Sequence, residues 1–202
     1  ANFESAMSRV ASVAGASEAE LKQMSEAARE AGASSVFSAS EAADAMYFLA
    51  SSGMSVDEQI TALNDTLNLA SAGGVDLARS AEIMTGSLAQ FQLGAEESGR
   101  VANLFAAGSA AANTDVEQLG MGMKEAGPIA AAFGMSIEET TAALASLANF
   151  NIKGAQGGTA LKSMLGSMNQ ETKAGAAALS QMGLTYGDIS LSTHSYEEAL
   201  NA

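Results

Sequence analysis

Regularly spaced glycines, placed after apolar stretches of helical periodicity, are the feature that most constrains how this chain can fold. Leu77, Ala81, Met84, Leu88 and Phe91 form the clearest stretch, with steps of four, three, four and three residues. A glycine after such a stretch is typical of a helix end, where a left-handed backbone excludes a Cβ. We therefore expect helices to end at Gly15, Gly32, Gly53, Gly73–Gly74, Gly94, Gly134, Gly154 and Gly183.

Helix starts are marked by serine or aspartate followed by glutamate. Ser55 with Glu58 and Ser136 with Glu139 have the spacing of capping boxes, in which serine and glutamate side chains satisfy the first free amides. Asp115 is predicted to open another helix. A further helix is expected to begin at Ser38 or Ser40, with Glu41 in its first turn.

Two of these starts repeat. The segment Gly53–Glu58 resembles Gly134–Glu139, and Leu93–Glu97 is a weaker copy between them. The copies lie about 40 residues apart, which fits a HEAT-like unit of two helices and two turns. Capping chemistry alone could also produce this similarity, so a true repeat and a coincidence of caps both remain open.

Together these patterns predict an all-α fold of short antiparallel helices in hairpins, as a compact bundle or a short HEAT-like solenoid. Pro128 is expected to end a helix running from Asp115 to about Ala126, with a short helix after it. We expect an N-terminal helical segment over residues 1–34 and a main helical region over 35–184. Residues 185–202 are expected to form a turn and the start of a last helix near Ser195 or Tyr196.

The composition excludes several classes of function. The net charge is −14, from 23 acidic and 9 basic residues, so the chain lacks the basic face that nucleic-acid binding needs. With no cysteine, it cannot form disulfides or use thiol chemistry. We expect no membrane span and no signal peptide. The chain begins with Ala rather than Met, and we interpret it as part of a longer protein.

Few residues suggest catalysis. The adjacent acids Asp57/Glu58, Glu96/Glu97 and Glu138/Glu139 point about 100° apart on a helix, and helix capping explains all three pairs better than paired-carboxylate chemistry. His194 is the only histidine and lies in a polar stretch, which favours a solvated side chain. We therefore predict no catalytic, cofactor-binding or metal-binding residues.

The glycine, alanine and methionine residues indicate how the predicted helices pack. The Gly154–Thr159 segment, followed by Lys162, lacks the spacing of a phosphate loop and is expected to form a tight turn with close helix packing. The alanines of 107–112 and 130–132 predict close helix contacts within or between chains. The 11 methionines, Met84, Met164 and Met168 among them, are expected to fill the core, with a methionine-rich partner surface as the alternative.

Several sequence blocks follow one another along the chain: Phe37–Met46, Leu49–Gly53, Leu67–Ala78, Asn113–Leu119, Gly127–Gly134, Ala145–Ala148, Ile152–Gly154 and Gly158–Ser163. In their order and spacing they resemble the conserved region of tape measure proteins of tailed phages, and the resemblance runs from about Phe3 to about Leu184. The family commonly has Arg where this chain has Lys162, and Gly where it has Asn151. These departures leave open any contact made by that turn.

The resemblance implies a structural virion protein that templates tail length, occupies the tail lumen and leaves it before or during DNA ejection. Its implied partners are tail tube, tail tip and tail-assembly chaperone proteins, with self-association in low copy number. The resemblance implies synthesis in the host bacterial cytoplasm and a final place in the virion tail, with no enzyme activity and no direct nucleic-acid binding. The alternative is a cell-wall-degrading or membrane-active module of the same protein, used during infection.

Overall fold

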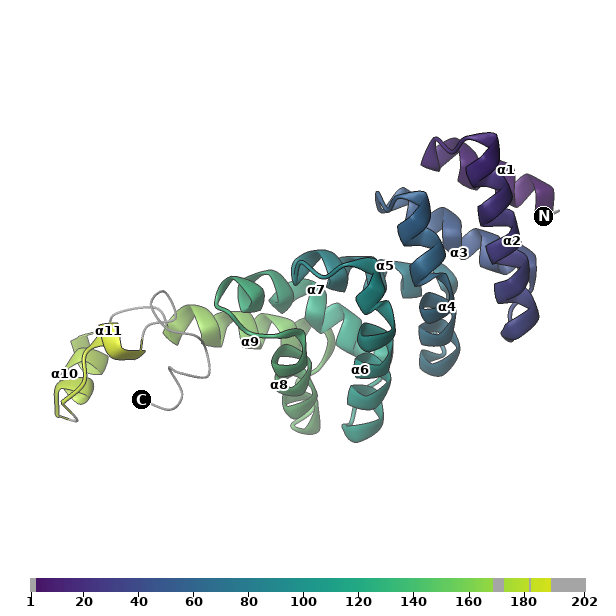
Figure 1. The fold of residues 1–202 in the computed structure, drawn as a ribbon. Helices are drawn as coiled ribbons and strands as arrows, with labels where there is room; N and C mark the ends of the chain where they lie inside the picture. The colour runs from purple at the N-terminus through teal and green to yellow at the C-terminus, as the bar shows by residue number, and fades with distance from the viewer. Residues whose placement is uncertain (1–2, 169–172, 182, 190–202) are drawn as a thin grey trace.

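In the computed structural model, which describes residues 3–168, 173–181 and 183–189, the chain is a series of α-helices joined by short turns (Figure 1). The helices that form the main body are α1 (Phe3–Ala14), α2 (Glu18–Ser34), α3 (Ala39–Ser51), α4 (Val56–Gly73), α5 (Leu77–Gln90), α6 (Ser98–Ala111), α7 (Val116–Ala132), α8 (Ile137–Asn149) and α9 (Gly154–Met168). A 3₁₀ turn, η1 (Ala95–Glu97), precedes α6, and α10 (Lys173–Gln181) and α11 (Tyr186–Ile189) follow α9. No strand occurs among the described residues, which confirms the predicted all-α class.

The nine helices of the main body form a two-layered stack. Each helix contacts the next helix in the chain and also the one after it. Consequently α2, α4, α6 and α8 lie side by side in one layer, and α3, α5, α7 and α9 in the other (Figure 1). This elongated arrangement is the solenoid alternative of the sequence prediction, in which each hairpin gains burial from its neighbours.

The turn between successive hairpins is built the same way three times. Met54, Leu93 and Met135 each donate a backbone hydrogen bond to a carbonyl five residues earlier, at 3.3, 2.8 and 3.0 Å. This is the long bond of a Schellman motif, which needs a left-handed residue just before the donor. Gly53 and Gly134 supply it with φ of 91° and 78°, as predicted, and Gln92 supplies it in the middle copy with φ of 54°.

The predicted helix starts are present. Ser38, Ser55 and Ser136 form capping boxes with Glu41, Glu58 and Glu139, and the Asp115 carboxylate accepts a hydrogen bond from the Gln118 amide. These contacts resolve the choice between Ser38 and Ser40 in favour of Ser38. The structure adds a fourth box, Ser17 with Glu20, which has the same serine-to-glutamate spacing.

Three predicted helix ends were wrong. Gly32 lies inside α2, which continues to Ser34. Gly94 has φ of −79° and precedes η1, because Gln92 already makes the left-handed turn. Gly154 begins α9 instead of ending α8, since Asn151 takes the left-handed position with φ of 63°. Asparagine tolerates this conformation better than most residues.

The predicted break at Pro128 was also wrong, because α7 runs through it to Ala132. The residue before a proline normally resists helical geometry because its Cβ crowds the proline ring, and here that residue is Gly127, which has no Cβ. Pro128 is on the exposed side of α7, as is Lys124, whose carbonyl loses its helical donor. Water can therefore bond this carbonyl, and packing of the buried face offsets the remaining cost.

The hydrophobic core extends along the stack and has no single centre. One cluster of buried residues joins α1 to α4, around Met24, Met46 and Leu63, and a second joins α4 to α9, around Phe105, Met123 and Leu161. Methionines fill both clusters, as predicted, although Met121 and Met164 are exposed. None of the described helices is long and apolar enough to cross a membrane.

Glycine permits the close approach of α7 and α9. A Cβ added to Gly158 would overlap the Gly122 carbonyl oxygen and come within 2.7 Å of the Glu125 Cβ. Close packing was predicted for the glycine-rich start of this helix, and this contact confirms it. The alanine run of α6 behaves differently, because Ala107, Ala110 and Ala111 are exposed, and the close contact of α6 with α8 is made by Gly108.

We expect Gly158→Ala to destabilise the fold by about 1–3 kcal/mol, because the new methyl group would force α9 away from α7. Thermal or urea unfolding followed by circular dichroism measures this change. Gly86→Ala in α5 is the matched control: its added Cβ meets nothing within 4 Å. That control is expected to stabilise the helix by about 0.5–1 kcal/mol. Equal stability of the two variants would contradict the packing argument.

Candidate functional site

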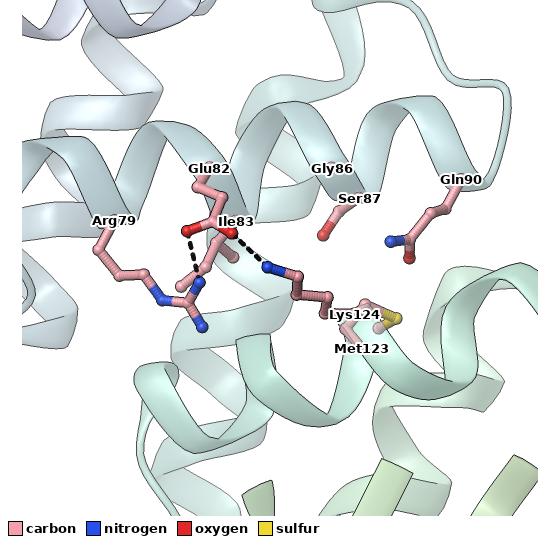
Figure 2. A pocket seen from close by; sticks show the side chains of 8 residues that line it. All are labelled: Arg79, Glu82, Ile83, Gly86, Ser87, Gln90, Met123 and Lys124. Carbon is pink, nitrogen blue, oxygen red and sulfur yellow. Dashed lines mark hydrogen bonds and ion pairs between the residues drawn. The ribbon is translucent and has the colours of Figure 1, made fainter. Parts of the chain in front are cut away.

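A small hollow bordered by three charged side chains lies between α5 and α7. It has a volume of about 140 Å³ and is lined by Arg79, Glu82, Ile83, Gly86, Ser87, Gln90, Met123 and Lys124. Figure 2 shows the α5 side chains pointing toward Lys124 and Met123 of α7. Because its walls come from two helical units, the hollow is a candidate both for binding a ligand and for holding the units together.

The charges around this hollow are paired. The Arg79 Nε lies 2.9 and 3.0 Å from the two carboxylate oxygens of Glu117, and another Arg79 nitrogen lies 2.7 Å from Glu82. The Lys124 Nζ bonds the other oxygen of Glu82 at 2.8 Å (Figure 2). Hydrogen bonds from Lys124, and then Arg79, hold the pKa of Glu82 below its ordinary value. This network ties α5 to α7 and leaves no unpaired acid at the hollow.

A similar arrangement joins α6 to α8. Arg100 contacts the two carboxylate oxygens of Glu138 at 2.6 and 2.9 Å and bonds Glu97 at 3.0 Å. The hydrogen bonds from Arg100 lower the pKa of Glu138. In both arrangements an arginine pairs with a glutamate 38 residues later, on the helix after next. The ion pairs therefore follow the repeat of the fold.

The Gln90 side chain, which lines the hollow, lies over Gly127 of α7. A Cβ on Gly127 would overlap the Gln90 Oε1 atom, so the flexible end of the Gln90 side chain would have to shift to accept a larger residue there. Within the described part of the chain, Gln90 Oε1 is buried without a hydrogen-bond partner. The contact brings the end of α5 against the part of α7 that contains Pro128.

The adjacent acids do not form a catalytic pair. Glu58 and Glu139 cap their helices as predicted, while Glu138 pairs with Arg100. The capping interpretation was wrong for Glu96/Glu97, because neither η1 nor α6 has a side-chain cap and Glu97 instead bonds Arg100. Of these acids, Glu58 and Glu139 cap helices, whereas Glu97 and Glu138 form ion pairs with Arg100.

The remaining candidates show no ligand chemistry. Residues Gly154–Thr159 open α9, where Gly157 and Gly158 are buried against neighbouring backbone and Lys162 is exposed. His194 and the helix predicted near Ser195 lie outside the described residues. Within the described ranges, no group of three or more acids or histidines could hold a metal ion.

Sequence analysis did not identify Arg79 or Arg100. Each arginine precedes a glutamate by 38 residues, close to the period suggested by the helix starts, and that offset was the available signal. The hydrogen bond of 2.6 Å from Ser98 to Asp65, which joins α6 to α4, had no comparable signal.

Comparison with known proteins decides the family. A sequence model described as "Phage-related minor tail protein" matches residues 25–202. The chain belongs to this family. The resemblance found in the sequence is therefore confirmed.

Two curated relatives are named as tape measure proteins. The chain is 39% identical over 186 residues, 92% of its length, to the "Tape measure protein" of Pneumococcus phage Dp-1. It is 28% identical over 170 residues, 84% of its length, to the "Probable tape measure protein" of Escherichia phage P2. It spans only 16% and 21% of the lengths of these two relatives. No solved structure matches the chain.

The two ion-pair networks predict how stability depends on pH. The folded-state pKa values of Glu82 and Glu138 are lowered, so folding favours their ionised forms. This stabilisation is fully present above the ordinary pKa of 4.5 and is lost as the pH falls through the lowered values. We expect Glu138→Gln to cost at most about 1 kcal/mol at pH 7, because the pair is partly exposed, and to cost less at pH 3.

Urea unfolding at pH 7 and pH 3 checks this expectation, with Glu30→Gln on the exposed face of α2 as the control. The control should change stability little at either pH. An equal cost of Glu138→Gln at both pH values would contradict an ionic role for Glu138.

Proposed function

We propose that this chain is a structural, non-catalytic segment of a phage tail tape measure protein. The observation that carries the proposal is the 39% identity to the Dp-1 tape measure protein over 92% of the chain. The paired charges support it, since the hollow between α5 and α7 offers neither convergent free acids nor an unpaired cation among the described residues. In this role the segment contributes length and packing.

The proposed setting is the lumen of the phage tail. There the chain would help to template tail length and would leave the tail before or during DNA ejection. The proposed partners are tail tube, tail tip and tail-assembly chaperone proteins, together with further copies of the chain. A net charge of −14 supports this setting, because a lumen protein that precedes DNA must not bind phosphate. Synthesis in the host cytoplasm is part of the same proposal.

The repeated turns provide a clean deletion for testing this role. Removing residues 94–135 from the full-length protein joins Leu93 directly to Ser136, so that α5 continues into α8 through a turn of the same type. We expect assembled tails to become shorter, by about 10 Å if the folded stack persists along the tail axis, because one helix is lost from each layer, and by about 60 Å if the segment is extended as a single helix with a rise of about 1.5 Å per residue. Electron microscopy of purified particles measures the change.

Duplication of the same residues is the matched control and should lengthen the tail by a similar amount. Normal tail length in both the deletion and the duplication particles would refute a templating role for this segment. Clearing of peptidoglycan by the purified chain in a zymogram would refute the non-catalytic part of the proposal.

A further inference from the structure

Two apolar side chains at the end of the stack are exposed. Phe150, directly after α8, is 80% exposed. Met164 is the eleventh residue of α9 and is 44% exposed, whereas the eleventh residues of α5 and α7, Ser87 and Ala126, are only 2% and 0% exposed. Among the described residues, α8 is the last helix of its layer (Figure 1). These exposures therefore mark the place where a neighbour that earlier helices have is missing.

Phe150 occupies the position that joins one helix of this layer to the next. It lies fifteen residues after Met135, which donates the long hydrogen bond of the turn before α8, and Gly108 lies fifteen residues after Leu93, the equivalent donor before α6. A Cβ on Gly108 would lie 3.0 Å from the Thr141 Cγ2 atom of α8. This position thus faces the following helix, and for Phe150 no such helix lies within the described part of the chain.

The sequence contains one further copy of the pattern that opens α4 and α8. Serine, an apolar residue, an acid and glutamate follow one another only at residues 55–58, 136–139 and 195–198. The first two copies are the capping boxes of α4 and α8, and their apolar residues, Val56 and Ile137, are buried. The third copy lies outside the described residues but inside the family match of 25–202. It predicts another helix of this layer, beginning at Ser195.

The chain also turns back before this segment. Leu184 donates a backbone hydrogen bond of 2.9 Å to the Leu179 carbonyl, and Gly183 has a φ of 76°. The Thr185 amide and hydroxyl then both bond the Asp188 carboxylate at 2.7 Å. The turns that lead into α4 and α8 combine the same long bond with the same kind of cap. Such a reversal is what a further helix beside α8 requires, because the chain must first turn back from the direction of α9.

We propose that the helix beginning at Ser195 packs beside α8 and covers Phe150, so that the stack continues within the same chain. Leu200 lies five residues after the serine of its pattern, as Thr141 does in α8. Since Thr141 meets Gly108, the same register places Leu200 against Phe150. This contact pairs two large apolar side chains, and removing them from water favours docking.

A pair of introduced cysteines tests this contact in the full-length protein, because residues 1–202 contain no cysteine of their own. Phe150→Cys combined with Leu200→Cys should form a disulfide within one molecule on mild oxidation, since only neighbouring Cβ atoms can be bridged. Peptide mass spectrometry identifies the linked residues. Non-reducing gels separate links within a molecule from links between molecules, and circular dichroism checks that the variants are folded.

Two further pairs are the matched controls. Gly108→Cys with Thr141→Cys is the positive control, because these positions already meet between α6 and α8. Gln23→Cys with Leu200→Cys is the negative control, since Gln23 is exposed on α2, toward the other end of the stack (Figure 1). The Phe150 and Leu200 pair should link at least about tenfold more than the negative control.

A second measurement does not depend on disulfide geometry. In the single variant Phe150→Cys, docking of the helix should slow labelling by a maleimide, and adding Leu200→Asp should make labelling faster. The same two measurements on Asn149→Cys, which lies beside Phe150 and is exposed on α8, are the control and should show no effect of Leu200→Asp.

Links formed only between molecules, or no more links than in the negative control, would overturn the proposal. A labelling rate of Phe150→Cys that Leu200→Asp leaves unchanged would do the same. These outcomes are separate from those of the deletion experiment. Unchanged tail length with a link inside the molecule would reject the templating role and leave the contact standing, and shorter tails without the link would do the reverse.

Discussion

The structure depends on one backbone arrangement, the reversal in which a left-handed residue lets an amide reach a carbonyl five residues back. It occurs with Gly53, Gln92 and Gly134, and the same bond forms after Gly15, Gly74 and Asn151, so it recurs at most turns of the main body. The bond terminates one helix, and the serine cap after Met54 and Met135 starts the next. Because each reversal sends the chain back along the preceding helix, every helix of the main body meets both the next and the one after.

The core follows from this geometry. A chain with few aromatic residues cannot fill a large central core, but a two-layer stack needs only thin contacts between neighbours. Alanine, methionine and glycine suit such contacts, as the approach of Gly158 to Gly122 shows. Ion pairs from Arg79 and Arg100 then connect helices two apart at the edges of these contacts. Apolar burial and ion pairs therefore stabilise the same contacts between neighbouring helices of the stack.

The arrangement also bears on function. The charges of Arg79 and Arg100 contact acids on other helices, and Glu58, Glu139, Glu97 and Glu138 serve helix capping or ion pairing. Membership of the phage minor tail protein family agrees with these structural roles.

The sequence alone determined the helical class, most helix starts and the reversals at Gly53 and Gly134, because periodicity, caps and left-handed glycines act within a few residues. It also indicated the family, through blocks whose order is a property of the chain itself. The continuation of α7 through Pro128 and the pairing of Arg79 with Glu117 were decided by the tertiary structure. Both depend on groups supplied by other helices, such as packing around Gly127 and a carboxylate 38 residues away, and local pattern carries no information about which distant surfaces meet.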